Sequence, residues 1–172
     1  YAIEAATQYD FADNPNAIDA HYALLEISGR YAIGKTLESI GLGLGLGYEL
    51  LSGNGGADAF QTPLGTNHAF QGAADRFLVT PGDGIRDGYV RLTARVAGTQ
   101  LAAEFHDFRS DRDDYRYGQE WNLLVEKPIA QRFLIGLQYA DYQAAHNSRN
   151  LARNSGSGHA FGSPAVQGFF GP

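Results

Sequence analysis

The sequence predicts an all-β protein, an antiparallel meander sheet that forms part of a transmembrane β-barrel of the outer-membrane type. Three observations support this class. Between Ile40 and Gly53 leucines alternate with glycines, so a strand there has one large apolar face and one nearly bare face. Six further segments alternate between apolar and polar residues in the same way. Long polar connections also alternate with tight turns along the chain, as they do in bacterial outer-membrane barrels.

The alternation defines seven strands, each of about the 9–11 residues that a tilted membrane strand requires. One parity of each segment is apolar and the other is polar or glycine, which is the pattern of a sheet with one apolar and one polar face. In chain order they are residues 1–12 (Ile3 against Glu4), 20–34 (Leu25 against Glu26), 41–52 (Leu44 against Gly45), 87–97 (Leu92 against Arg91), 99–108 (Phe105 against Glu104), 117–126 (Trp121 against Glu120) and 132–142 (Ile135 against Gly136).

The connections predict which ends of the strands lie together. Gly98 and Pro128 mark tight turns at residues 97–100 and 127–131, whereas residues 53–86 and 109–116 form long or charged loops. If strand direction alternates, both loops lie at one end of the sheet and both turns at the other. The turn at 97–100 also brings two strands side by side, so that Arg95 can pair with Glu104.

Composition narrows the classes of function. The chain has 172 residues and a formal net charge of −6, so it offers no basic patch for nucleic acid. It contains no cysteine, which excludes disulfides, thiolate metal sites and a cysteine nucleophile. No apolar run reaches the ~18 residues of a transmembrane helix. It also contains no methionine, and we expect a processed product or a fragment of a longer chain.

We expect no enzyme, metal site or cofactor. The five histidines lie in unrelated segments without a metal-binding spacing, and the acidic run at Asp111, Asp113 and Asp114 lacks the glycine and distant glutamate of a calcium loop. Glu104 and Glu120 could be imagined as a glycosidase pair, but facing carboxylates on a polar wall explain them without catalysis.

One loop segment carries a family resemblance. Residues 60–81 read F-Q-T-P-L-G-T-N-H-A-F-Q-G-A-A-D-R-F-L-V-T-P, which closely resembles a stretch of the alginate-export family of outer-membrane porins. Shorter segments at 84–89, 117–121 and 139–142 are also similar to that family, and the resemblance spans about residues 20–145. Ala73 replaces a family tryptophan.

The resemblance divides the chain into two parts. Residues 1–145 would be barrel strands of an alginate-export-like domain, corresponding to the C-terminal third or so of a barrel of about eighteen strands. Residues 146–172 lack the family's final aromatic-ended strand, are rich in Gly and Ser, and are expected to be a disordered, non-homologous tail. A frameshifted or truncated terminus is our hypothesis for this departure.

The implied function is passive passage of anionic, alginate-like polysaccharide or of small acidic or organic solutes across the bacterial outer membrane, with membrane lipid and lipopolysaccharide as surroundings. Such a pore needs cations to steer the solute and carboxylates to prevent tight binding. Ion-pair ladders that merely fill the wall are the equally weighted alternative. The candidate pore-lining residues are Arg30, Glu49, Arg91, Arg95, Glu104, His106 and Glu120, with Arg91 and Arg95 the strongest candidates for solute contact.

The long loop is too apolar to extend into water, and we predict that it folds over the mouth or into the lumen. Phe60, Leu64, Phe70, Phe77 and Leu78 would then pack on the inner wall, and either a gate or a stabilising plug would result. The alternative function is a soluble or periplasmic β-domain that binds carbohydrate through Tyr115, Tyr117 and Trp121. The candidate constriction residues are Phe60, Pro63, His68, Phe70, Asp75, Arg76 and Phe77.

Overall fold

All regular secondary structure in the computed structural model is β-strand. The structure describes residues 1–11, 17–34, 40–56, 58–62, 71–129, 133–146, 158–162 and 166–168. Within these ranges no helix is long and apolar enough to cross a membrane.

The seven predicted strands are all present, within a few residues of their predicted bounds. Alternating parity is a local property that needs no knowledge of the fold, which explains the agreement. The strands are β1 (Ala2–Tyr9), β2 (Asp19–Ile33), β3 (Ile40–Leu51), β4 (Ile85–Val96), β5 (Thr99–Arg109), β6 (Arg116–Ile129) and β7 (Phe133–Ala144).

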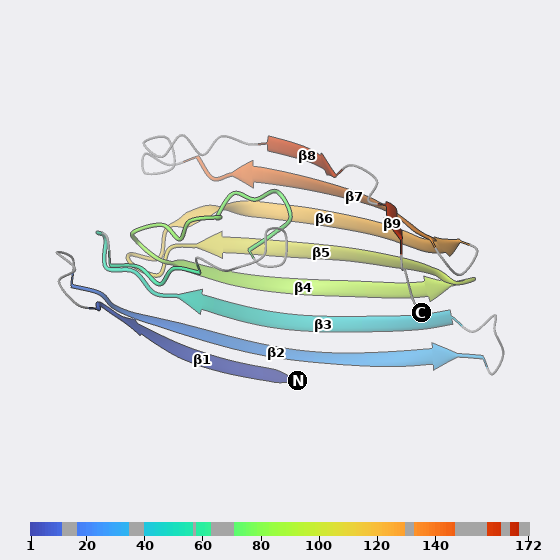
Figure 1. Cartoon of the computed structure of the whole chain (residues 1–172), viewed down its shortest axis with the longest axis horizontal. Helices are drawn as coiled ribbons and strands as arrows, with labels where there is room; N and C mark the ends of the chain where they lie inside the picture. The colour runs from blue at the N-terminus through green and yellow to red at the C-terminus, as the bar shows by residue number, and fades with distance from the viewer. Residues whose placement is uncertain are drawn as a thin grey trace.

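The strands form one antiparallel meander, in which each strand pairs with its neighbours in the sequence (Figure 1). The predicted architecture of the sheet is therefore confirmed. Among the described residues β1 pairs only with β2, so the sheet is open and has two edges. No pairing closes it into a barrel.

The predicted sidedness is confirmed for the two long connections and for the turn at 97–100, whereas residues 130–131 of the second predicted turn lie outside the described residues. In Figure 1 the connections between β3 and β4 and between β5 and β6 lie together at the left, and the β4–β5 turn lies at the right. Ala97 and Gly98 form that turn with φ values of 47° and 76°, and Val96 pairs directly with Thr99. Two central residues with positive φ are the signature of the tight hairpin turn that matches strand twist.

The segment that we expected to be a disordered tail contains two short strands. β8 (Gly158–Gly162) and β9 (Val166–Gly168) both pair antiparallel with β7, along different parts of its free edge. The backbone groups of β7 are therefore partly covered by the chain's own terminus. The rest of residues 147–172 lies outside the described part.

The long connection between β3 and β4 is held against one face of the sheet. In Figure 1 it crosses in front of β5 and β6. Phe77 from this connection belongs to the main buried cluster together with one residue from each of five strands, which are Leu51, Ile85, Phe108, Tyr117 and Tyr142. The core of the described structure is therefore formed between this loop and the loop end of the sheet.

Candidate functional site

One face of the sheet is apolar over its whole width, and it is exposed in the part of the chain that the structure describes. Leu92 at the centre is 54% exposed and Leu137 near the edge is 57% exposed. The register places Leu44 opposite Leu92, and in other rows Leu101 opposite Val125, so the apolar side chains of neighbouring strands adjoin. A continuous exposed apolar surface of this width is unusual for a protein surrounded by water.

The apolar face is organised in zones along the strands. From Ile40 to Tyr48 the apolar parity of β3 runs for eight residue steps. At ~3.3 Å per residue this is about 26 Å along the strand, or about 20 Å along the normal for a tilt of about 40°. Toward the loop end an aromatic pair, Phe105 and Trp121, borders the aliphatic zone with ring centroids 4.9 Å apart.

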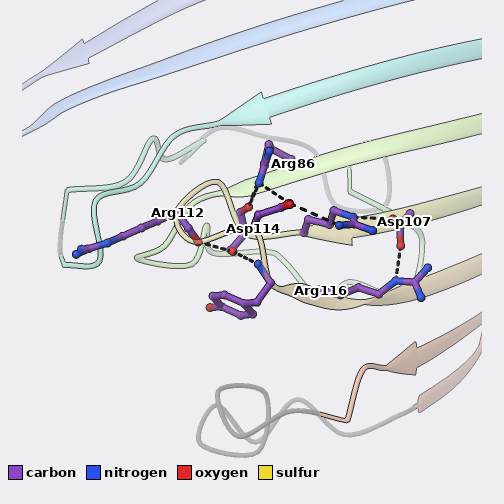
Figure 2. A network of polar contacts seen from close by, with 8 residues as sticks. Arg86, Asp107, Arg112, Asp114 and Arg116 are labelled. Atoms are coloured by element: carbon purple, nitrogen blue, oxygen red, sulfur yellow. Dashed lines mark hydrogen bonds and ion pairs between the residues drawn. The ribbon is translucent and has the colours of Figure 1, made fainter.

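Beyond the aromatic pair, toward the loops, the same face becomes charged. Figure 2 shows this network of arginine and aspartate side chains. Asp107 accepts hydrogen bonds from Arg116 Nε at 2.5 Å and from Arg109 Nε at 3.0 Å, and Asp114 accepts one from Arg86 Nη2 at 2.8 Å. The face therefore passes from aliphatic to aromatic to charged, which is the order found across a membrane interface.

The other face of the sheet is polar and carries most of the candidate site residues. Arg91 lies directly opposite Glu104 in the β4–β5 register and donates to its Oε1 atom at 2.5 Å. Arg91 Nη1 also lies 3.7 Å from Glu26 Oε2. The suggested pairing of Arg95 with Glu104 is wrong, because the two-residue turn places Arg95 opposite Gln100.

His106 is held between two carboxylates on this face. Its Nδ1 atom lies 2.8 Å from Asp87 Oδ2, and its Nε2 atom lies 3.5 Å from Glu104 Oε2. Both His106 and Asp87 are buried. The imidazole therefore connects the Arg91–Glu104 pair to the buried carboxylate of Asp87. Together these four side chains form a row of ion pairs along β4 and β5, which we call the ion-pair ladder.

Two glutamates on the polar face attach the long loop. Glu49 of β3 accepts a hydrogen bond from Gln71 Nε2 at 2.7 Å, and Glu120 of β6 accepts one from the Ala74 backbone N–H at 3.0 Å. Gly72 has a φ of +84°, and a Cβ atom there would lie 2.5 Å from Glu120 Oε1. Residues 71–74, which we call the strap, thus lie against the polar face of the sheet and are attached to it at both ends. Gly72 permits the close approach of the strap to Glu120 because it has no side chain.

An aromatic anchor follows the strap. Phe77 is 7% exposed, and its ring centroid lies 4.8 Å from that of Phe108 and 5.4 Å from that of Tyr117. The guanidinium of Arg76 lies over the Tyr142 ring, 5.3 Å from its centroid.

The expectation that the loop packs its aromatics on the polar face is met for Phe77 and for Phe60, which stacks on Tyr22 at 5.5 Å. It is not met for Leu78, which is exposed. Asp75 is half-buried in the turn between the strap and the anchor. Pro63, Leu64, His68 and Phe70 lie outside the described residues.

A cavity of about 360 Å³ lies on the polar face beside the strap. Gln71, Gly72 and Ala73 border it on one side, and the polar face of the sheet borders it on the other. The polar side chains of the sheet that line it are Glu26, Glu49, Asp87, Tyr89, Arg91, Glu104, His106, Asn122 and Gln138. Three apolar side chains, of Leu24, Ala102 and Leu124, complete the lining. Five of the seven predicted pore-lining residues are therefore brought together at or beside this cavity, counting Glu120 through its contact with Gly72.

Arg30 and Arg95 lie elsewhere on the polar face, nearer the tight-turn end. Arg30 is paired in register with Gly43 and Arg95 with Gly41, two positions apart along β3. They border a second cavity of about 490 Å³. Throughout the described ranges no ion pair or side-chain hydrogen bond engages either guanidinium.

The sequence reasoning missed several residues of this site. Tyr89 lies over Gly47 and donates to Glu26 Oε2 at 2.8 Å. Asp87 and Asn122 lie on the polar parity of their strands and could have been included on that signal alone. Gln71 carries no such signal, because a loop residue has no periodicity that assigns it to a face.

The aromatic residues of the soluble alternative do not form one platform. Trp121 lies on the exposed apolar face, whereas Tyr117 is buried in the cluster with Phe77 on the opposite face. Tyr115 donates from its hydroxyl to Asp83 Oδ2 at 2.7 Å.

No protein-family model, no curated protein and no solved structure matches this chain. Among the described residues no group of three or more His, Cys, Asp or Glu is arranged to hold a metal ion.

Proposed function

We propose that the chain forms part of the wall of an outer-membrane β-barrel channel of the alginate-export type. The observation that carries the proposal is the uncovered apolar face with its aliphatic, aromatic and charged zones. Burying a side chain such as Leu92 in lipid contributes roughly 1.5–3 kcal/mol relative to leaving it in water. With more than twenty large apolar residues exposed, lipid is the surrounding that this face fits best.

The soluble β-domain fits this surface less well. A soluble sandwich needs Leu42, Leu44 and Leu46 to face a second sheet across a core ~10 Å thick. In the residues that the structure describes, all nine strands belong to one sheet. The leucines are exposed on its face opposite the strap.

The single tryptophan of the chain provides the test. Trp121 is 50% exposed at the border between the aliphatic and charged zones. In protein reconstituted into bilayers, lipids brominated near the headgroup should quench its fluorescence more strongly than lipids brominated near the acyl-chain end. If neither lipid quenches Trp121 while the protein is folded, the apolar face does not lie in the membrane and the proposal fails.

For the solute we propose passive passage of anionic polysaccharide or of small acidic molecules. Arg30 and Arg95 support this choice, because their guanidinium groups have no carboxylate partner in the described structure. Arg91 does not, because Glu104 and Glu26 already surround it. The preference for Arg91 as a solute contact is therefore replaced by a preference for Arg30 with Arg95.

Ion selectivity tests this assignment. In the complete protein in planar bilayers, Arg30→Glu together with Arg95→Glu should shift the reversal potential toward cations. Arg109→Glu together with Arg116→Glu is the matched control, since this pair makes the same charge change on the opposite face of the sheet. Equal reversal potentials for the double variant and the unmodified protein would show that these arginines do not contact the permeating ions.

A further inference from the structure

We propose that the cavity beside the strap of residues 71–74 is a binding site for a small organic cation that carries an ammonium group. The inference goes beyond the proposed channel function, because that function assigns an anionic solute and the cavity has the opposite sign. The proposed site also does not require the membrane, because the strap and the polar face of the sheet form the cavity by themselves.

The first observation is the charge of the lining. Four carboxylates, of Glu26, Glu49, Asp87 and Glu104, line the cavity together with one guanidinium and one imidazole. Even with the imidazole counted as protonated, the formal charge of the lining is negative by two units. Glu120 lies directly beyond, opposite His106 in register, and adds a further carboxylate. An anion entering this space would meet a repulsive field, and a cation an attractive one.

The second observation is an unpartnered amide oxygen. Asn122 is 6% exposed, lines the cavity, and lies between Glu104 and Ala140 in the register. Its Nδ2 group is the side that interacts with the Glu120 carboxylate, whereas its Oδ1 atom has no hydrogen-bond partner in the described structure. Buried amide oxygens are nearly always hydrogen-bonded, and no described residue fills this role, so a bound donor would complete the site.

Together these groups fit an ammonium ion better than a metal ion. An ammonium donates up to three hydrogen bonds in different directions, and the Asn122 Oδ1 atom and the carboxylates of Glu26 and Glu104 are acceptors. The described residues offer no arrangement of three ligands that would hold a metal ion. The volume of about 360 Å³ admits an ammonium with a short organic substituent.

Binding is tested by ligand-dependent stability. The complete protein, folded in detergent, is heated in methylammonium chloride, in sodium chloride of equal ionic strength and in sodium acetate. We expect the midpoint of unfolding to rise with methylammonium concentration and to be unaffected by acetate, because only a ligand of the native state stabilises it.

Asn122→Ala should weaken the apparent affinity for methylammonium by about tenfold or more, as expected when a hydrogen bond to a charged group is lost. Asn122→Asp should strengthen it, because the substitution adds a negative charge at the same position. Glu126→Gln is the control: it removes a carboxylate from the same face of β6 but outside the cavity, and should leave the affinity unchanged.

A purely structural role for Asn122 predicts that both substitutions change stability equally with and without methylammonium, and this result would overturn the inference. Protection by acetate, or by calcium but not by methylammonium, would overturn it as well. Quenching of Trp121 by brominated lipid in the same preparation separates the two proposals. If Trp121 is quenched but methylammonium does not raise the midpoint of unfolding, the channel proposal is supported and the cation-site proposal is wrong.

Discussion

Gly47 is the position at which the packing of the polar face can be tested most sharply. The Tyr89 ring lies so close to it that a Cβ atom at Gly47 would be 2.1 Å from the ring carbon Cζ and 2.4 Å from the hydroxyl oxygen. Ordinary contact begins at 3.4 Å, so in Gly47→Ala the ring has to move by about 1.3 Å or more. The hydrogen bond from Tyr89 to Glu26 holds the ring in place and would be lost.

Gly45→Ala is the matched control. Gly45 lies two residues away on the same strand and the same face, but a Cβ atom there would lie 3.6 Å from its nearest neighbours, the Cβ atoms of Arg91 and Ser28. Replacing glycine by alanine removes freedom from the unfolded chain and stabilises by roughly 0.4–1 kcal/mol where the conformation permits it. This term is common to both variants and cancels in their difference.

The expected difference is therefore the cost of overpacking, about 1–3 kcal/mol, with Gly47→Ala the less stable variant. Equilibrium unfolding in urea at equal m-values measures it. In a Tyr89→Ala background the ring is absent, and the two glycine substitutions should have the same effect. If Gly47→Ala and Gly45→Ala are equally stable in the native background, the ring does not rest on Gly47 and the argument is refuted.

Two further comparisons test the loop and the ion-pair ladder. Phe77→Ala should cost about 3–5 kcal/mol of loop docking and expose the long loop to protease, whereas Leu78→Ala, next to it but exposed, should change stability by less than about 0.5 kcal/mol. If protease cleaves the loop equally fast in both variants, Phe77 does not hold the long loop on the sheet. Arg91→Gln should destabilise by about 1 kcal/mol, because it leaves Glu104 without its closest partner, whereas Arg95→Gln should be neutral within error. If the midpoint of thermal unfolding falls equally in both variants, the Arg91–Glu104 ion pair does not stabilise the protein.

The strands and their faces could be predicted because each depends on a repeat of two along a short segment. Register could not be predicted from that repeat, because it depends on how the turn closes. With Ala97 and Gly98 as the only central residues of the hairpin, Arg91 must face Glu104, whereas a longer turn would have moved Arg95 toward it. A turn of two residues with positive φ fixes the register of the whole β4–β5 pair. If the predicted turn is two residues too long, every residue of β4 is therefore assigned a wrong partner on β5.

The positions of single aromatic residues were harder to predict. Tyr117 belongs by parity to the same face as Trp121, but the ladder shifts register next to it: Phe108 pairs with Gly118 and Arg109 with Arg116. The unpaired Tyr117 therefore turns inward to the core, as extra residues in a β-bulge can. Phe77 and Leu78 are neighbours in a loop without periodicity, and only the packing of Phe77 against the rings of Phe108, Tyr117 and Tyr142 decides that one is buried and the other exposed.

The charge beneath the strap of residues 71–74 is determined by the sheet more than by the loop. The strap is fixed to Glu49 on β3 and to Glu120 on β6, so it crosses over β4 and β5. It uses the Gln71 side-chain amide and the backbone N–H groups of Ala73 and Ala74 for these contacts, and residues 71–74 bring no cation to the carboxylates beneath them. Among the described residues that line the cavity, only Arg91 and His106 can balance those carboxylates, and two cations are too few for four carboxylates. An excess of negative charge under the strap is thus a consequence of where the loop is attached.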